Sequence, residues 1–252
     1  MKSKKKIYYA LISAAFWLIL WQALAMAVSS DLLVPVPVSV IKRLFALCAE
    51  RDFRISAVVS LSRVSLGFIT GAVLGTLFAV GTAKSPLLSA IIKPALSMIK
   101  ATPVASFIIL ALVWLKSGQV PVLTAALVTT PVFWSNTEKG ILQTDAKLLE
   151  MARAYRLKKS AVFAKIYVPS VKPYFFAAVN SAMGMAWKAG IAAEVLCPFG
   201  NSIGTALYNS KIYLEITDLF AWTFAVVILS IVLEKLIMFF VRKERVSLAE
   251  TE

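Results

Sequence analysis

Lys188 and Glu194 are the only charged side chains in an apolar stretch between residues 174 and 196. Charge in an apolar environment is costly, so such residues usually face a cavity or a partner. Lys188 could attract an anionic ligand, and Glu194 and Trp187 are candidates to line the same cavity. The alternatives are a structural ion pair, or a lysine that extends its ammonium group to a membrane surface. Six residues place the two charges about 240° apart around a helix, so we do not expect them to pair with each other.

The residue types on which most enzymes rely are missing or isolated. The chain has no histidine, which is the commonest general base and metal ligand. Cys48 and Cys197 are far apart and form no CxxC pair. No GxxxxGK[ST] or GxGxxG sequence is present to bind a nucleotide. We therefore predict a chain that is not itself an enzyme and that binds no metal and no cofactor.

The composition indicates a membrane protein. Of the 252 residues, 60% are hydrophobic and 16% are charged, whereas soluble domains are about 45–50% apolar. The net charge of +14 is compatible with nucleic-acid binding. However, the basic residues lie between apolar runs, which is typical of the signals that orient membrane proteins. The sequence thus predicts an all-α integral membrane protein that binds no nucleic acid.

The apolar runs are long enough to cross a membrane as helices. A spanning helix needs about 20 mainly apolar residues. We predict about six, at Ile7–Ser29, Val64–Thr82, Leu87–Leu115, Val120–Thr137, Tyr174–Leu196 and Leu219–Val241. Pro94 and Pro103 interrupt the third run, so its membrane portion is expected to begin near Pro103. If that segment is re-entrant, five spans result.

Lysine and arginine are distributed unevenly between the spans, and this sets the predicted orientation. With the N-terminus inside, the outer segments hold mainly Lys42, Arg43, Arg51, Arg54, Arg63, Lys116 and Lys211. Most other basic residues then face the cytoplasm. So do both termini and residues 141–172, which we call the basic segment. The first span begins like a signal peptide, but its apolar run exceeds the usual length of about 7–15 residues. We therefore expect an uncleaved anchor.

Gly67, Gly71 and Gly75 recur every four residues in the second span. Small residues at this spacing form a helix face that another helix can approach closely. We predict packing within the chain rather than a seam between two copies.

The basic segment is elaborate for a connection between spans. Apolar residues recur at helical spacing at Leu148, Met151, Ala152 and Tyr155. Asp145 is the expected N-cap of this helix. Ser160 is expected to cap a second short helix, Ala161–Tyr167, which Pro169 ends. The segment is either a helical handle for a soluble partner or a helix on the membrane surface whose lysines contact anionic lipid.

Four residues of the basic segment fall in register with a known pattern: Glu150, Ala152, Ile166 and Pro169. The pattern, roughly E-A-A-x-x-x-G-x9-I-x-L-P, is the EAA loop of bacterial ABC-importer permeases, which the segment resembles. Met151 replaces the first alanine. Arg156 occupies the usual glycine position, which leaves the shape of the turn between the two helices open.

The resemblance extends along most of the chain. Further groups of residues occur in the order expected for the family: Ser60-Leu61-Ser62-Arg63-Val64 with Gly67-Phe68, Ala101-Thr102-Pro103, Trp114 with Gly118, Pro131 with Asn136-Thr137 and Gly140, and Ala186-Trp187 with Ala193-Glu194. The series is most similar to the sulfonate, taurine and nitrate branch of the MetI-like, type I importer permeases.

The resemblance implies a fold, a location and partners. It implies a type I ABC-importer permease fold, multi-pass in a bacterial inner membrane among lipid. The partners would be a second copy in a homodimer, a cytoplasmic ATPase dimer that holds ATP and Mg, and an extracytoplasmic substrate-binding protein. The residues implied to contact the ATPase are Glu150, Met151, Ala152, Arg156, Ile166 and Pro169. Glu150 would pair with a basic ATPase residue; otherwise it is a solvated carboxylate.

The resemblance also implies domain boundaries and a transported solute. Residues 1–55 would form an anchor helix and an extracytoplasmic amphipathic segment, 56–241 the permease domain and 242–252 a cytoplasmic tail. The cargo would be a small solute such as a sulfonate, taurine or nitrate, with Trp187, Lys188 and Glu194 as candidate path residues. The alternative is an ATP-independent secondary transporter or channel, for which the sequence offers no convincing inverted repeat.

Overall fold

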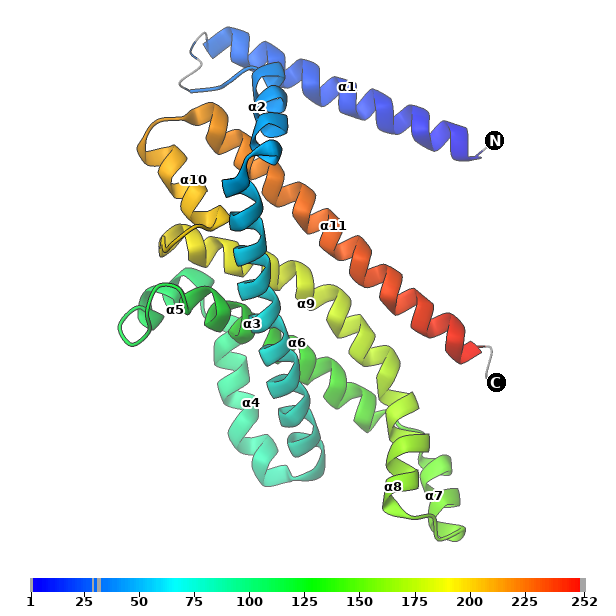
Figure 1. The fold of residues 1–252 in the computed structure, drawn as a ribbon. Coiled ribbons are helices and arrows are strands. Elements are labelled where there is room, and N and C mark those ends of the chain that lie inside the picture. The colour runs from blue at the N-terminus through cyan, green and yellow to red at the C-terminus, as the bar shows by residue number, and fades with distance from the viewer. Residues whose placement is uncertain (1, 29, 31–32, 250–252) are drawn as a thin grey trace.

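The computed structural model describes residues 2–28, 30 and 33–249, with side chains for 8, 9, 11–28, 30 and 33–239. Every regular element within these ranges is helical (Figure 1), which confirms the all-α prediction. Ser29 at the end of the first predicted span and residues 250–252 of the predicted tail lie outside the described residues, as do the side chains of the N-terminal lysines.

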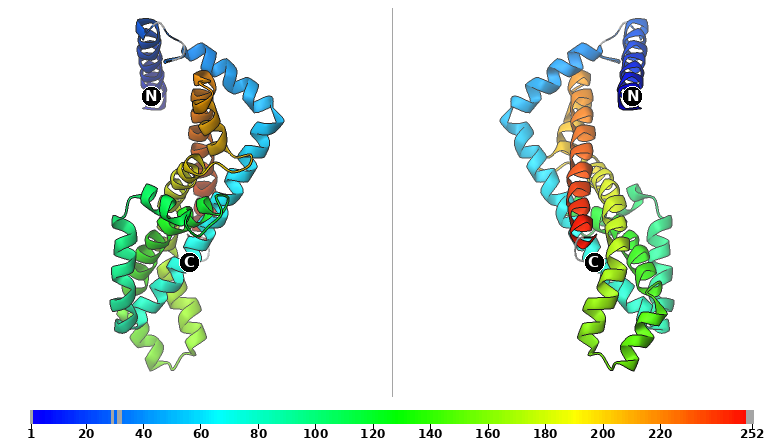
Figure 2. Two further views of the ribbon diagram at one scale, coloured as in Figure 1. Left: turned by 90° about the vertical axis from the view of Figure 1, so that its left-hand side faces the viewer. Right: turned by 90° about the vertical axis from the view of Figure 1, so that its right-hand side faces the viewer.

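Three long helices form the centre of the molecule: α3 (Arg51–Lys84), α6 (Val120–Leu142) and α9 (Val168–Leu196). α6 packs extensively against both α3 and α9, whereas α3 and α9 contact each other over a shorter stretch (Figures 1 and 2). Phe133 of α6 is fully buried between them. Its ring lies edge-on to Phe68 of α3 at 5.4 Å between centroids and 5.3 Å from Phe175 of α9. Aromatic packing thus joins all three helices at one level.

The glycines of α3 lie against α6. A Cβ atom on Gly67 would lie 2.7 Å from the Cβ of Ala125, and one on Gly75 would lie 2.7 Å from the Cβ of Phe133. Both distances are too short for carbon atoms, so the two backbones approach as closely as they do because these side chains are absent. The glycine face is therefore used for packing within one chain.

The third predicted span is broken into α4 (Pro86–Ala101) and α5 (Val104–Ala111), which meet at 103°. The break is at Pro103, because the residue before a proline is pushed out of helical geometry; Thr102 is extended, at φ −80° and ψ 131°. Where the membrane portion of this segment begins stays a prediction. The helix after Pro103 has 8 residues, about 12 Å of rise, and is too short to cross alone. Pro94 lies inside α4 without ending it.

The number of membrane spans stays a prediction. Within the described residues, three helices are long and apolar enough to cross: α1 (Lys2–Val28), α3 and α11 (Ile216–Ala249), with α4 and α5 as a bent fourth. The other two predicted spans lie in α6 and α9, which have 23 and 29 residues but carry more polar side chains. Five helices extend beyond the predicted spans that they contain, and the membrane boundaries themselves stay predictions: α1, α3, α6, α9 and α11.

The outer helices pack on one end of the centre. α2 (Pro37–Ala49) and α10 (Ile203–Ile212) lie beside α11, and α1 projects away from the rest (Figures 1 and 2). Arg43 of α2 donates two hydrogen bonds to Asp218 of α11, at 2.6 and 2.7 Å. The ring of Trp21 in α1 stacks on Phe224 of α11 at 5.6 Å.

Two predicted domain boundaries fall inside helices. The boundary after residue 55 lies in α3, and the chain instead breaks at Glu50, which is extended between α2 and α3. The predicted tail, 242–252, is not a separate element, because α11 continues without interruption to Ala249.

Candidate functional site

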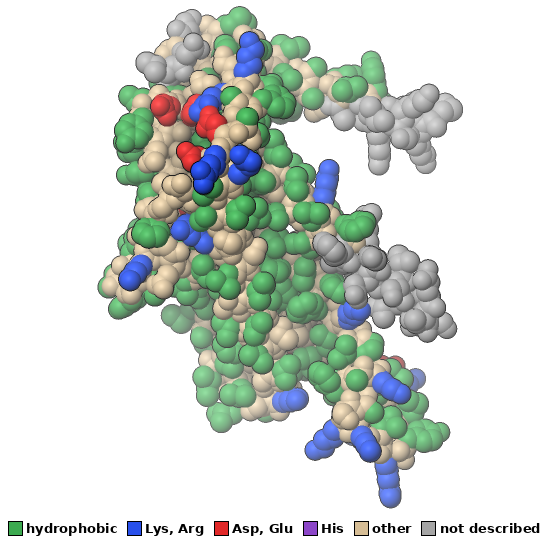
Figure 3. All heavy atoms as spheres, in the orientation of Figure 1, with side chains coloured by type: hydrophobic (Ala, Val, Ile, Leu, Met, Phe, Trp, Pro, Cys, Tyr) green, Lys and Arg blue, Asp and Glu red, His purple; other side chains and the backbone are tan. Residues whose placement is uncertain are grey.

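The basic segment forms the end of the molecule remote from α2 (Figure 1). It contains α7 (Ala146–Ala154), α8 (Lys159–Val162) and a π-helical turn, Phe163–Tyr167, which leads into α9. Lysine and arginine side chains gather on this end (Figure 3). The segment is thus a compact, basic projection rather than an open loop.

The first helix of the segment has well-defined ends. The Asp145 carboxylate accepts a hydrogen bond from the Lys147 N–H at 2.8 Å, which confirms the predicted N-cap. At the other end, the Leu157 N–H bonds the Ala152 carbonyl at 2.9 Å and the Arg156 N–H bonds the Arg153 carbonyl at 3.0 Å. These are the two bonds of a Schellman motif, which places the residue after the C-cap in left-handed geometry. That residue is Arg156, with φ 49°.

The second helix of the segment differs from the prediction. Lys158, not Ser160, precedes it, and its side chain makes no capping hydrogen bond. Pro169 does not end it: α8, the π-helical turn and α9 follow one another without a break. Pro169 lies within this continuous helical run, directly after the wider π-helical turn, and donates no backbone hydrogen bond there. The wider turn before it closes with a hydrogen bond from the Val168 N–H to the Phe163 carbonyl.

The predicted contact residues of the segment divide into two groups. Ala152 and Ile166 are buried, 3% and 6% exposed, and they hold α7 and the π-helical turn to the rest of the chain. The remaining predicted residues are exposed: Glu150, Met151, Arg156 and Pro169. Tyr155, on the same predicted apolar stripe as Ala152, is 76% exposed. The stripe is therefore only partly used inside the chain, and its outer part presents apolar surface to the surroundings.

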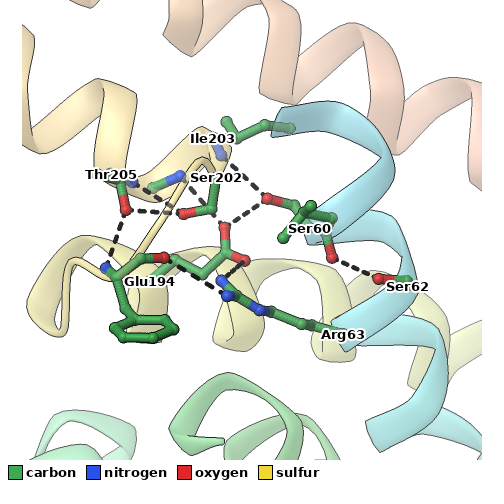
Figure 4. Close-up of polar contacts among 10 residues, drawn as sticks. Ser60, Ser62, Arg63, Glu194, Ser202, Ile203 and Thr205 are labelled. Carbon is green, nitrogen blue, oxygen red and sulfur yellow. Dashed lines mark hydrogen bonds and ion pairs between the residues drawn. The ribbon is translucent and has the colours of Figure 1, made fainter. Parts of the chain in front are cut away.

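A second polar cluster surrounds Glu194 near the other end of α9 (Figure 4). Glu194 is 1% exposed. The carboxylate accepts hydrogen bonds from Ser60 Oγ at 2.6 Å and the Gly204 N–H at 3.2 Å. Arg63 Nη1 completes the set at 3.2 Å. The carboxylate also faces the N-terminus of α10, where the helix dipole favours negative charge. Three elements, α3, α9 and α10, thus meet at one satisfied carboxylate.

The other two candidate path residues lie elsewhere on α9. Trp187 is 1% exposed, and its indole N–H donates to the Val226 carbonyl of α11 at 3.2 Å. Lys188 is exposed. The structure therefore does not bring Trp187, Lys188 and Glu194 together, and the role of each in a solute path stays a prediction.

Comparison with known proteins identifies the family. Residues 71–245 match the family described as "Binding-protein-dependent transport system inner membrane component". The chain belongs to this family. This permease is 26% identical over 226 residues to the nitrate import permease protein NrtB of Synechocystis sp., an alignment that covers 84% of this chain and 80% of that protein. It is also 26% identical over 213 residues to the putative aliphatic sulfonates transport permease protein SsuC of Bacillus subtilis, covering 84% and 77%.

A solved structure supports the fold of the permease. A chain of a bacterial alginate ABC transporter, in complex with a periplasmic protein bound to an alginate pentasaccharide, superposes with a TM-score of 0.61 at 13% identity. The match covers 95% of this chain and 93% of that chain. The all-helical ABC-permease fold expected from the sequence is therefore confirmed.

Sequence reasoning missed the partners of Glu194 in the permease. Arg63 was assigned to an outer connection, whereas it lies within α3 with its side chain 16% exposed. Ser60 is predicted only as part of a family motif, with no contact assigned to it. One signal in the sequence could have predicted this pair: a single carboxylate in one predicted span and an arginine at the start of another. In an apolar interior, opposite charges are expected to pair.

Replacing Arg156 by glycine is expected to stabilise the permease. Left-handed geometry costs a non-glycine residue about 1–2 kcal/mol, and glycine avoids this cost. We expect Arg156→Gly to raise the thermal unfolding midpoint in neutral detergent by about 3–6 °C. Arg153→Gly removes the same side chain from the interior of α7, where glycine is unfavourable, and should lower the midpoint. Equal decreases in the two variants would show that the Arg156 side chain, not its backbone, determines the turn.

Proposed function

We propose that this chain is the membrane permease of an ATP-driven importer and that its basic segment docks onto a separate ATPase chain. ATP and Mg would be held by that ATPase, which fits a permease sequence without a phosphate-binding loop. Closure of an ATPase pair would then move two basic segments together and change the packing of the membrane helices.

The surface of α7 carries this proposal. Glu150, Met151 and Tyr155 are exposed on a short helix that is capped at both ends. The helix is anchored through the buried Ala152 and through Ile166 in the following turn. A rigid projection that combines a carboxylate with apolar side chains suits a cleft on a soluble protein better than it suits bilayer headgroups, where Glu150 would face anionic lipid.

The assembly and topology are part of the same proposal. Two permease copies would form a homodimer, with the basic segments and both termini in the cytoplasm and a substrate-binding protein on the opposite side. In α1, only 6% of the apolar stretch Leu11–Val28 is buried within the chain. Its surface is therefore available to lipid or to the second copy. Residues 56–241 would act as the permease domain.

The cargo is proposed to be a small oxyanion. The names of two relatives refer to nitrate and to aliphatic sulfonates, and both contain a planar or tetrahedral group of oxygens with a single negative charge. Lys188 is exposed on α9 and would attract such an anion if α9 lines the path. The binding protein would select among oxyanions before the permease receives one.

Reversing the charge of Glu150 tests the proposed docking. We expect Glu150→Lys to weaken association with the ATPase roughly tenfold, because a favourable exposed charge pair becomes a repulsive one. The measurement is the amount of ATPase that co-purifies with tagged permease, together with ATP-dependent uptake of nitrate or a sulfonate in liposomes that contain the complete transporter.

A matched substitution separates docking from general damage. Glu215→Lys makes the same charge change on an exposed residue just before α11, at the opposite end of the molecule from α7, and should leave co-purification unchanged. Equal ATPase recovery from both variants would argue against docking through α7. Full solute uptake by the permease alone, without ATP, would favour the secondary-transporter alternative instead.

A further inference from the structure

A cavity lies between the basic segment and the central helices. Its volume is about 950 Å³. It is partly open to the surroundings and is lined by residues of α3, α6, α7, α8, the π-helical turn and α9. Most of its lining is apolar, including Val80, Ala152, Leu157, Val171 and Phe175. Small-molecule pockets range from about 300 to 1,000 Å³. The cavity is thus far larger than a single inorganic anion requires.

The lining carries positive charge and no negative charge. Five cations belong to it: Lys84, Arg153, Arg156, Lys159 and Lys172. No aspartate or glutamate is among the lining residues. Within the part of the chain that the structure describes, none of the first four forms an ion pair with a carboxylate. Clustered cations beside an apolar wall attract an anion that also has an apolar part.

Two buried hydroxyl groups in the lining lack a partner. Thr76 Oγ1 and Thr137 Oγ1 are buried and make no hydrogen bond with the described residues. Thr137 is 1% exposed. Buried hydroxyl groups are rarely left without a hydrogen bond, because desolvation without compensation is costly. Neither oxygen is open to the cavity, so the two hydroxyl groups lie behind its wall and do not themselves identify an occupant.

We propose that the cavity binds an anionic phospholipid from the leaflet on the side of the basic segment. The phosphate would lie among the five cations and the acyl chains against the apolar wall. Basic pockets between membrane helices are a known way to hold such headgroups. The lipid would bridge α7 to α3 and α9, so it would stiffen the basic segment whatever the transported solute is.

Lipid titration tests the site. The full-length chain in neutral detergent is titrated with phosphatidylglycerol or with phosphatidylcholine of the same acyl chains, and the thermal unfolding midpoint is recorded. We expect phosphatidylglycerol to raise the midpoint at lower concentration. Lys84→Gln/Lys159→Gln should need roughly 30-fold more of it for the same rise, since each lysine contributes about 1 kcal/mol to binding an anionic lipid. Both side chains are exposed, so the midpoint without lipid should not change.

Two further variants keep the test decisive. Lys147→Gln/Lys165→Gln removes two exposed lysines of the basic segment that do not line the cavity, and should respond like the native chain. Val171→Trp adds a bulky ring to the apolar wall while keeping all five cations, and should weaken the response. The proposal is overturned if the two double variants respond alike. It is also overturned if millimolar butanesulfonate reproduces the rise, because the site would then take a soluble oxyanion.

Discussion

Replacing Arg63 by alanine is expected to lower the free energy of unfolding of this permease by about 3–5 kcal/mol. The substitution leaves the Glu194 carboxylate, 1% exposed, without its cation. Ser60 and the Gly204 N–H would still donate hydrogen bonds to it, but neither carries a charge. In thermal unfolding in detergent, the midpoint should fall by about 10 °C.

Two comparisons show whether the ion pair causes this loss. Arg54→Ala removes an exposed arginine from the same helix and should change the midpoint little. In a Glu194→Gln background the carboxylate has no charge, so Arg63→Ala should then cost much less than in the native chain. This non-additivity is the signature of a direct interaction. If Arg63→Ala and Arg54→Ala have similar effects, the pair does not stabilise the fold.

The central helices were predictable because local sequence determines them. The apolar length of α3, α6 and α9 and the four-residue glycine spacing are periodic properties of single segments. The predicted helix ends were less accurate, because each helix continues beyond its apolar part into turns that also contain polar residues. Asp145 was found because an N-cap acts on a backbone group two residues away.

The features that were missed depend on contacts between distant segments. Arg63 and Glu194 are 131 residues apart, and no periodicity relates them. The bend between α4 and α5 follows from Pro103, but its angle is set by packing on other helices. The left-handed backbone at Arg156 could be predicted only in part. The family pattern marked the position, while only the backbone shows that arginine adopts the conformation that glycine prefers.

The close approach of α3 to α6 should be sensitive to added volume. In Gly75→Ala the new Cβ would lie 2.7 Å from the Cβ of Phe133 and 2.9 Å from the Trp134 nitrogen. It would also overlap the Thr130 carbonyl oxygen. Two of these three atoms belong to the backbone of α6, so the helices must separate. We expect destabilisation by about 1–3 kcal/mol, measured as a thermal midpoint lower by about 3–9 °C.

Gly81→Ala makes the same substitution on the same helix and should act in the opposite direction. A Cβ at this position would meet only Leu88 Cδ1, at 3.4 Å. Because alanine favours the helical backbone more than glycine does, this variant should be neutral or more stable by up to about 1 kcal/mol. The contrast separates helix propensity from interhelical distance: if alanine at position 75 is tolerated as well as at 81, the glycine face does not set the approach of α3 to α6. Its spacing would then serve a contact outside this chain.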